Sequence, residues 1–174
     1  KSIGMGLYKA ACAARVNGKV CDLRTPLTED CEVEILTFDD TDGKKAYWHT
    51  TSHILAQAVC RLYPGTKFAI GPAVDNGFYY DFDFETPIAG EDLEKIEAEM
   101  KKIIKENIAL ERFELPAAQA MEKMAGQPYK QELIEEHAEG GEQISFYAQG
   151  DFTDLCAGPH LLSTGCVKAV KLTS

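Results

Sequence analysis

The chain has 174 residues, of which 45% are hydrophobic and 26% charged, and this balance favours one or two soluble domains with a hydrophobic core. It has no apolar run near the length of a membrane span and no visible signal peptide, so we expect a cytoplasmic protein without membrane contact. A formal net charge of −10 opposes non-specific binding to nucleic acid.

Six cysteines occur without a CxxC pair or a dense framework, and we expect them to be reduced thiols. Because the chain starts at Lys1 rather than at methionine, we expect a fragment of something longer. An RNA partner would have to be bound locally on such an acidic protein, or by another part of the parent protein.

The first forty residues are expected to form a short helix, a hairpin and a strand, at residues 7–14, 15–23 and 31–37. The helix is predicted from an alanine-rich run, and Asn17-Gly18 is a strong signal for a type I′ turn in the hairpin. Alternation in the strand predicts a core face that carries Val33 and Ile35. Forty residues are near the lower limit for independent folding, so this segment should lean on the next one.

Residues 39–44 are polar and are predicted to be a linker, which divides the chain into the domains 1–40 and 41–174. A helix is expected to begin at residues 48–53, where threonine and serine hydroxyls can cap the first turn. An apolar stripe at helical spacing follows, and the helix should end near Pro64, because proline cannot continue it.

Beyond this helix, strands and helices alternate irregularly, which suggests an α+β fold rather than a doubly wound sheet. Strands are expected at residues 67–72, 78–85, 112–115, 144–148 and 167–172. Helices are expected at residues 91–110, 116–125 and 131–138, and a loop at 139–142. The strand at 78–85 would present an aromatic face, from which the Tyr80 hydroxyl could reach a pocket.

Two spaced pairs of side chains are the main candidates for chemistry, and they include three of the four histidines. His49 and His53 are four residues apart, so they should be neighbours on one helix face. Cys156 and His160 repeat that spacing about a hundred residues later. All four side chains can bind a metal or move a proton, and we call them the quartet. The plainer alternative is a set of ordinary surface residues.

Four ordered motifs resemble the editing domain of threonyl-tRNA synthetases: HxxxH, KFAIGPAVDNGFYYDFDF, PYK and DLCAGPH. The preceding AARVNGKVCDLRTPLTEDCEVEILT looks like the later part of a TGS domain, a small β-grasp fold. The resemblance implies a partial β-grasp segment followed by an α+β editing domain with a mostly antiparallel sheet and packed helices. The opening hairpin of the β-grasp fold and the class II aminoacylation core have no counterpart here.

This resemblance implies hydrolytic proofreading of seryl-tRNA, so the expected partner is the acceptor end of tRNA(Thr) carrying serine. Serine lacks one methyl of threonine, and a missing methyl gives a pocket only ~1–3 kcal/mol of discrimination, which makes an editor necessary. The parent enzyme is expected to be a homodimer and the fragment a monomer. Two alternatives stay open: a free-standing deacylase acting in trans, and a non-catalytic module that binds tRNA or zinc.

The resemblance also implies roles for individual side chains. His49 or Cys156 would position or deprotonate water, and Lys130 would stabilise charge near the terminal ribose. Asp154 would accept the ammonium group of the seryl ester. Substrate and neighbouring groups would be oriented by three further side chains, His53, His160 and Tyr80. No cofactor is expected, and zinc held by the quartet is the alternative.

Overall fold

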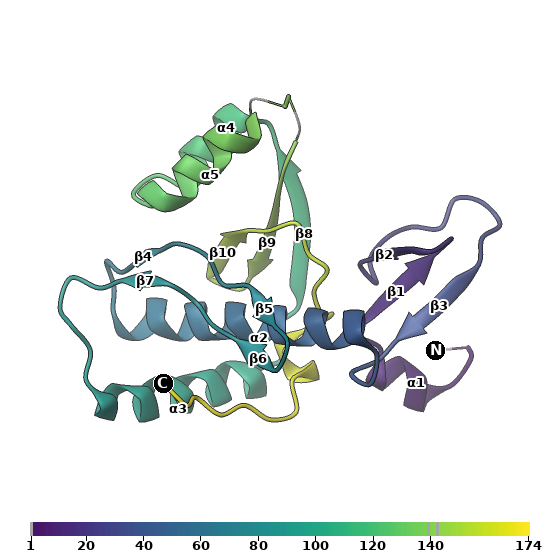
Figure 1. The fold of residues 1–174 in the computed structure, drawn as a ribbon, viewed down its shortest axis with the longest axis horizontal. Helices are drawn as coiled ribbons and strands as arrows, with labels where there is room; N and C mark the ends of the chain where they lie inside the picture. Colours follow the sequence, from purple (N-terminus) through teal and green to yellow (C-terminus); the bar gives the residue numbers. More distant parts are fainter. Residues whose placement is uncertain (1, 139, 142) are drawn as a thin grey trace.

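The computed structural model describes residues 2–138, 140–141 and 143–174, so Glu139 and Glu142 of the expected loop lie outside the described residues. Helices occur together with antiparallel sheets, which confirms the α+β prediction. Figure 1 shows a small N-terminal lobe, residues 2–40, to the right of a larger lobe. Within the described ranges, no helix is both long and apolar enough to cross a membrane.

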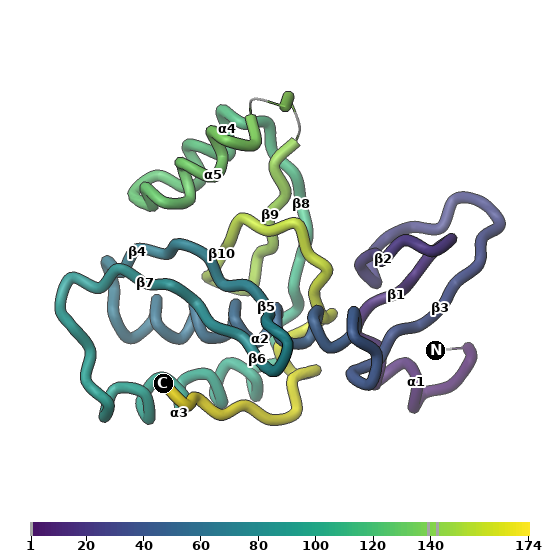
Figure 2. Tube along the Cα trace, in the orientation of Figure 1, coloured from purple at the N-terminus to yellow at the C-terminus, as the bar shows by residue number. Residues whose placement is uncertain are grey.

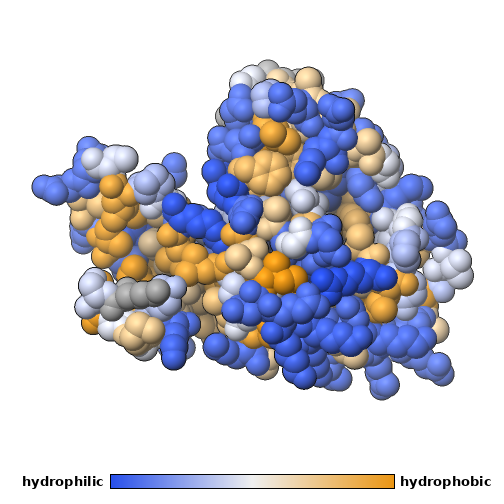
Figure 3. Space-filling view, turned by 180° about the vertical axis from the view of Figure 1, so that it is seen from behind, coloured by the Kyte–Doolittle hydropathy of each residue, from blue (hydrophilic) through white to orange (hydrophobic). Residues whose placement is uncertain are grey.

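The N-terminal lobe packs a short helix near a small antiparallel sheet. Its elements are α1 (Met5–Ala10), β1 (Ala13–Val16), β2 (Lys19–Cys21) and β3 (Val33–Leu36), with the strands in the order β2-β1-β3. Asn17 and Gly18 have positive φ angles of 47° and 81° and close the hairpin as predicted. Apolar side chains gather on the outside of this lobe in the view from behind (Figure 3), in keeping with a segment too short to bury them alone.

Two expectations for the N-terminal lobe are wrong. The helix expected at residues 7–14 ends at Ala10, because Ala13 and Ala14 are buried in β1, where packing overrides the helix propensity of alanine. In β3 the fully buried side chain is Leu36, which pairs with Ala13, whereas Val33 is 42% exposed. The core face of β3 is therefore not the one that alternation predicted.

The central element is α2 (Thr41–Leu62), a helix of 22 residues that begins inside the stretch predicted to be a linker. Asp40 accepts hydrogen bonds from the amide and the hydroxyl of Thr37, and a Cβ on Gly43 would lie 1.9 Å from the Thr37 carbonyl oxygen. Only glycine allows the chain to pack this closely on the first helical turn. The two histidines of α2 therefore lie in the middle of a buried helix and not at its N-terminus.

Two short ribbons and a second helix pack against α2. The ribbons pair β4 with β7 and β5 with β6, and these strands are β4 (Lys67–Phe68), β5 (Ala73–Val74), β6 (Gly77–Phe78) and β7 (Phe82–Asp83). They replace the longer strands expected at residues 67–72 and 78–85. The helix α3 (Gly90–Glu106) runs beside α2, and the main hydrophobic core lies between these elements (Figure 1).

A second antiparallel sheet stands on the other side of α2. Its strands are β8 (Leu110–Leu115), β9 (Ile144–Gln149) and β10 (Phe152–Leu155), in the order β10-β9-β8. The helices α4 (Ala117–Lys123) and α5 (Pro128–Ala138) link β8 to β9 as a hairpin (Figure 2). Helices and strands were expected at most of these places, but β10, which leads into the DLCAGPH motif, was not.

The strand expected at residues 167–172 is wrong. A 3₁₀ turn, η1 (Thr164–Cys166), is followed by a tail that the described residues leave without a strand partner, and this tail lies along α3 (Figure 2). The amide of Leu172 donates a hydrogen bond to the Glu97 carboxylate, and Nζ of Lys171 lies 3.1 Å from it. Contacts with a helix side chain thus take the place of a strand ladder.

Candidate active site

The helix α2 and the loop after β10 bring the quartet together. Nε2 of His49 lies 3.3 Å from the sulfur of Cys156, and Nε2 of His160 lies 3.1 Å from the same sulfur. The rings of His49 and His53 are 5.2 Å apart, as expected for positions i and i+4 of a helix. One nitrogen or sulfur from each of the four side chains can be chosen so that all lie within 4.8 Å of one another.

Cys156 and His160 approach each other without a helical turn between them. The amide and carbonyl of Cys156 are held by the carbonyl and hydroxyl of Ser145, at 3.0 and 2.8 Å. Gly158 has a φ of 77° and donates its N–H to the Cys156 sulfur, and a Cβ there would lie 2.3 Å from the Tyr147 hydroxyl. The loop can therefore double back on itself only with glycine at this position.

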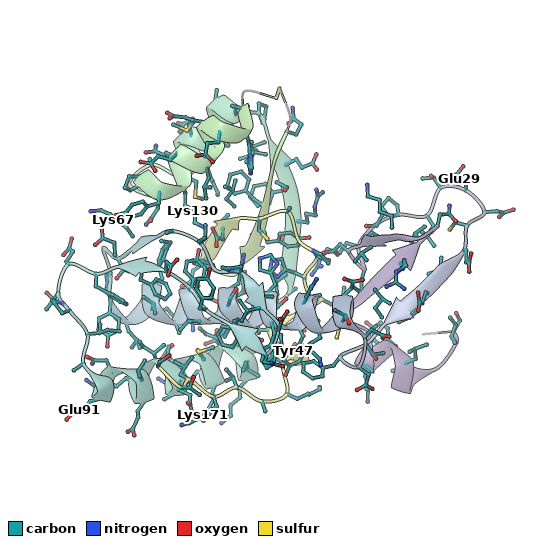
Figure 4. The ribbon with its side chains drawn as sticks, in the orientation of Figure 1. Glu29, Tyr47, Lys67, Glu91, Lys130 and Lys171 are labelled. Atoms are coloured by element: carbon teal, nitrogen blue, oxygen red, sulfur yellow. The ribbon has the colours of Figure 1, made fainter. Side chains whose placement is uncertain are left out.

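A buried charge pair lies beside the quartet. Nζ of Lys130 is 2.7 Å from Oδ1 of Asp154, and the Tyr80 hydroxyl donates to Oδ2 at 2.6 Å. Nε2 of His53 lies 3.6 Å from the same oxygen, so His53 connects the pair to the quartet. Figure 4 labels Lys130 on the side of α5 that faces β4 and α2. Lys130 is only 4% exposed, although lysine side chains usually lie in solvent.

Three members of the quartet and both members of the charge pair line one cavity of about 910 Å³. His49, His53, Cys156, Lys130 and Asp154 all line this cavity. The other two predicted site residues, Tyr80 and His160, are buried behind these lining side chains and contact them. The structure thus gathers all seven predicted residues around a single cavity, while the chemical role of each stays a prediction.

Burial sets the protonation states of the quartet. It lowers the pKa of His49 to about 4 and that of His53 to about 3, and it lowers the pKa of His160 well below its ordinary value. It also raises the pKa of the Cys156 thiol to about 12. Near neutral pH the site therefore holds three neutral imidazoles and a thiol. Desolvation is the cause, since the helix N-terminus is two turns away.

The charge pair behaves differently. Burial on its own would raise the pKa of Asp154, but the charge of Lys130, with His53 and the Tyr80 hydroxyl, outweighs burial and lowers that pKa below its ordinary value. Burial beside Asp154 also raises the pKa of Tyr80 well above its ordinary value. The pair is therefore a carboxylate and an ammonium in contact, with a protonated phenol as a further donor.

Thr50 is a site residue that the sequence did not reveal, because it resembled a helix cap. Its oxygen lies 2.9 Å from the amide of Leu161 and 2.9 Å from Nδ1 of His160. The hydroxyl oxygen accepts the amide N–H, and Nδ1 of His160 is the acceptor found for the hydroxyl proton among the described residues. We assign the proton of His160 to Nε2 on this network, which directs an N–H at the Cys156 sulfur.

The donor set was tested for zinc. The spacing of the quartet is close to what zinc needs, since its ligand atoms lie within 4.8 Å of one another and those around a tetrahedral zinc lie about 3–4 Å apart. The hydrogen bonds fit less well, since in the tautomer assigned above Nε2 of His160 carries the proton, and zinc would need its lone pair. Binding would require the imidazole to change tautomer and would leave the buried Thr50 hydroxyl without its acceptor.

Comparisons with known proteins find a family model that matches each end of the chain. A family model described as the TGS domain matches residues 1–37, and one described as the threonyl and alanyl tRNA synthetase second additional domain matches residues 144–174. Cys156 and His160 lie inside the second match, whereas His49 and His53 lie between the two matches. The predicted domain boundary after residue 40 stays a prediction.

The whole chain aligns with curated proteins. It is 63% identical to the threonine–tRNA ligase of Acetivibrio thermocellus, 62% to that of Clostridium tetani and 61% to that of Caldanaerobacter subterraneus subsp. tengcongensis. These alignments cover 99% or more of this chain but only 27–28% of the relatives. Over its whole length the chain is therefore similar to threonine–tRNA ligases, of which it spans little more than a quarter, and its two ends match the TGS and second additional domain models.

Proposed function

We propose that this chain hydrolyses the ester bond of seryl-tRNA, as the proofreading part of a threonyl-tRNA synthetase. The observation that carries the proposal is the cavity of about 910 Å³, in which neutral imidazoles, a thiol and a charge pair meet. Ester hydrolysis needs a base for water, a proton for the leaving oxygen and stabilisation of an oxyanion. His49 can take a proton from the water and pass it to the leaving ribose oxygen, while Lys130 stabilises the oxyanion.

His49 is the best-placed general base. Its imidazole is neutral above about pH 4, is only partly buried and lines the cavity, whereas His53 and His160 are 3% and 0% exposed. A base must have a free lone pair within reach of the water. His53 and His160, whose rings lie 5.2 and 4.4 Å from that of His49, keep it in place.

Cys156 acts as a thiol and not as a nucleophile. A pKa of about 12 leaves almost no thiolate near neutral pH, and the thiolate is the form that attacks an ester. The sulfur accepts the N–H of Gly158 and, in the tautomer assigned above, that of His160. Its own proton is then available to hydrogen-bond His49 or a water. We therefore favour direct attack by water over an acyl-enzyme.

Lys130 supplies positive charge for the oxyanion, and Asp154 holds it in place. A carboxylate offers about four lone-pair directions, and Lys130 and Tyr80 each take one on different oxygens. The remaining directions can receive the ammonium group of the seryl ester. The acceptor end is single-stranded, so its 2′-hydroxyl and terminal base are the groups to recognise. A chain with a net charge of −10 must make that contact locally.

The spacing of the quartet also supports a second candidate, a zinc-binding module without turnover. We favour the metal-free deacylase, because the tautomer of His160 opposes a metal. Elemental analysis of protein purified without added metal separates the two. The deacylase proposal expects zinc far below one equivalent and full activity in the presence of a chelator. One equivalent of zinc, with activity that chelation removes, would contradict it.

The proposed function is tested by the rate at which serine is released from seryl-tRNA(Thr). Wild type should accelerate release, and His49→Ala should remove the acceleration while leaving the circular dichroism spectrum unchanged. Cys156→Ala should slow release, with Cys60→Ala as the matched control, because Cys60 is exposed and lies at the far end of α2. Equal rates for wild type and His49→Ala would remove the proposed mechanism.

A further inference from the structure

Two residues of the N-terminal lobe contact the loop that follows β10 in the larger lobe. This loop, residues 156–162, carries Cys156 and His160, and we call it the active-site loop. Asp22 and Arg24 follow β2 and lie in the segment that matches the TGS domain. Asp22 is only 8% exposed, which is unusual for a carboxylate in a lobe this small. Its partners are therefore the reason for its burial.

Asp22 holds the backbone of the loop that carries His160. Its Oδ2 accepts the His160 amide at 3.1 Å and the Tyr147 hydroxyl at 2.6 Å. Its Oδ1 accepts the amide and the guanidinium of Arg24, at 2.9 and 2.7 Å. Among the described residues, the hydrogen bonds to this carboxylate thus come from the active-site loop, from β9 and from Arg24.

Arg24 binds the same loop through its carbonyl groups. Its guanidinium donates to the carbonyl oxygens of Leu110, His160, Leu161 and Leu162, at distances between 2.7 and 3.3 Å. A planar guanidinium can serve several acceptors at once, which a lysine ammonium cannot do with the same geometry. Together the two side chains satisfy an N–H and three consecutive carbonyls of residues 160–162.

These contacts are made to the backbone of His160, which is itself a member of the quartet. The amide of His160 is bound by Asp22 from the N-terminal lobe, while its ring is bound by Thr50 from α2 and lies 3.1 Å from the Cys156 sulfur. The Tyr147 ring also packs on the His160 ring, with centroids 4.4 Å apart. A shift of this loop would move His160 and Cys156 relative to His49.

We propose that Asp22 and Arg24 are positioning residues of the active site, so that the TGS-matching segment completes the site and is not a separate appendage. This inference rests on the proposed deacylase function. Misplacement of reacting groups by about 1 Å costs on the order of 10²-fold in rate. Asp22→Asn keeps the shape of the side chain but presents an amide donor to the His160 or Tyr147 donor. We expect kcat for seryl-tRNA to fall about 10²-fold and KM to change less than about threefold.

The matched control is Asp30→Asn, because Asp30 is an exposed acid of the same lobe. It should keep wild-type turnover. Nitrogen-15 spectra of the histidine rings give a readout apart from turnover, since the chain has only four histidines. Asp22→Asn should shift the His160 ring signals, and Asp30→Asn should not. Wild-type kcat in a folded Asp22→Asn protein would overturn the proposal.

Two further outcomes are decisive. If Asp22→Asn does not fold, Arg24→Lys tests the same loop from its carbonyl side. A folded Arg24→Lys protein with wild-type kcat would then overturn the proposal, and a loss of about 10²-fold would support it. If wild type itself releases no serine, the proposed function fails. The histidine spectra alone then test whether Asp22 positions His160. Unshifted His160 ring signals in Asp22→Asn would then refute the positioning role, and shifted signals would support it.

Discussion

Lys130→Met tests how the buried charge pair contributes to both stability and catalysis. Lys130 and Asp154 have side chains only 4% and 3% exposed, and they are 2.7 Å apart. Removing one partner of a buried pair leaves an uncompensated charge and costs about 3–5 kcal/mol in unfolding free energy. In a chain of this size that lowers Tm by roughly 10 °C. Deacylation measured below the new Tm should still fall, because the oxyanion loses its positive neighbour.

The cost of Lys130→Met should depend on pH with a definite sign. In wild type the pKa of Asp154 is lowered, so this group's contribution to stability is present above its ordinary pKa and is lost as pH falls through the lowered value. Without Lys130, burial dominates and raises that pKa, so the variant recovers stability as Asp154 becomes protonated. The difference between wild type and variant should therefore shrink as pH falls from 7 toward about 4.

Urea unfolding followed by circular dichroism measures these free energies. Exposed Lys105→Met is the control and should unfold within ~0.5 kcal/mol of wild type. Adding Asp154→Asn to Lys130→Met removes the stranded charge and should recover at least about 2 kcal/mol. A Lys130→Met protein with wild-type stability at pH 7 would refute the buried pair, whatever its activity.

Three further predictions follow from the protonation states and hydrogen bonds. The pKa of His49 is about 4, so its neutral form is present above that pH and lost below it. The rate of single-turnover deacylation that depends on His49 should therefore be constant between about pH 5.5 and pH 7.5. A steep fall in this rate below pH 7 would contradict the prediction. Thr50→Val should slow deacylation about tenfold and Thr50→Ser should restore it, with nitrogen-15 shifts reporting the His160 tautomer. Lys101 and the Leu172 amide lower the pKa of Glu97 to about 2, so the contribution of Glu97 to stability is present above pH 4.5 and is lost as pH falls toward 2. Glu97→Gln should make the C-terminal tail susceptible to limited proteolysis already at pH 7.

Local signals in the sequence were enough for some of the regular elements, such as α3 and the first hairpin. In α3, Ile96, Met100 and Ile103 recur at helical spacing, and all three are buried as that spacing predicts. The Asn17-Gly18 turn was predictable for a similar reason, because few residues adopt positive φ angles. The four motifs also identified the segments that meet at the site, since each motif carries its chemistry within a few residues.

Contacts between distant segments could not be predicted in this way. The start of α2 depends on the close packing of Gly43 on Thr37, and no polar stretch announces such a contact. Thr50 and His160 are 110 residues apart, and Asp22 and His160 are 138 apart, so neither bond leaves a local pattern. Lys130 is the same case, because its burial is made favourable by Asp154, which is distant in the sequence.

The propensities of single segments failed where tertiary partners decided the outcome. Ala13 and Ala14 favour helix, yet they are buried in β1 because Ile35 and Leu36 pair with them. The tail at residues 167–172 has an alternating pattern, but its amide partner is Glu97 of α3. In both places contacts with a distant segment outweighed the preference of the local sequence.

The most direct test of the account compares release of serine and of threonine from the same tRNA(Thr) by the purified chain. A cavity that serves as an editing site should hydrolyse the seryl ester at least about tenfold faster than the threonyl ester, since one methyl is worth ~1–3 kcal/mol. His49→Ala should reduce both rates to the uncatalysed level. Equal hydrolysis of the two esters, or none of either, would contradict the assignment of this site to proofreading.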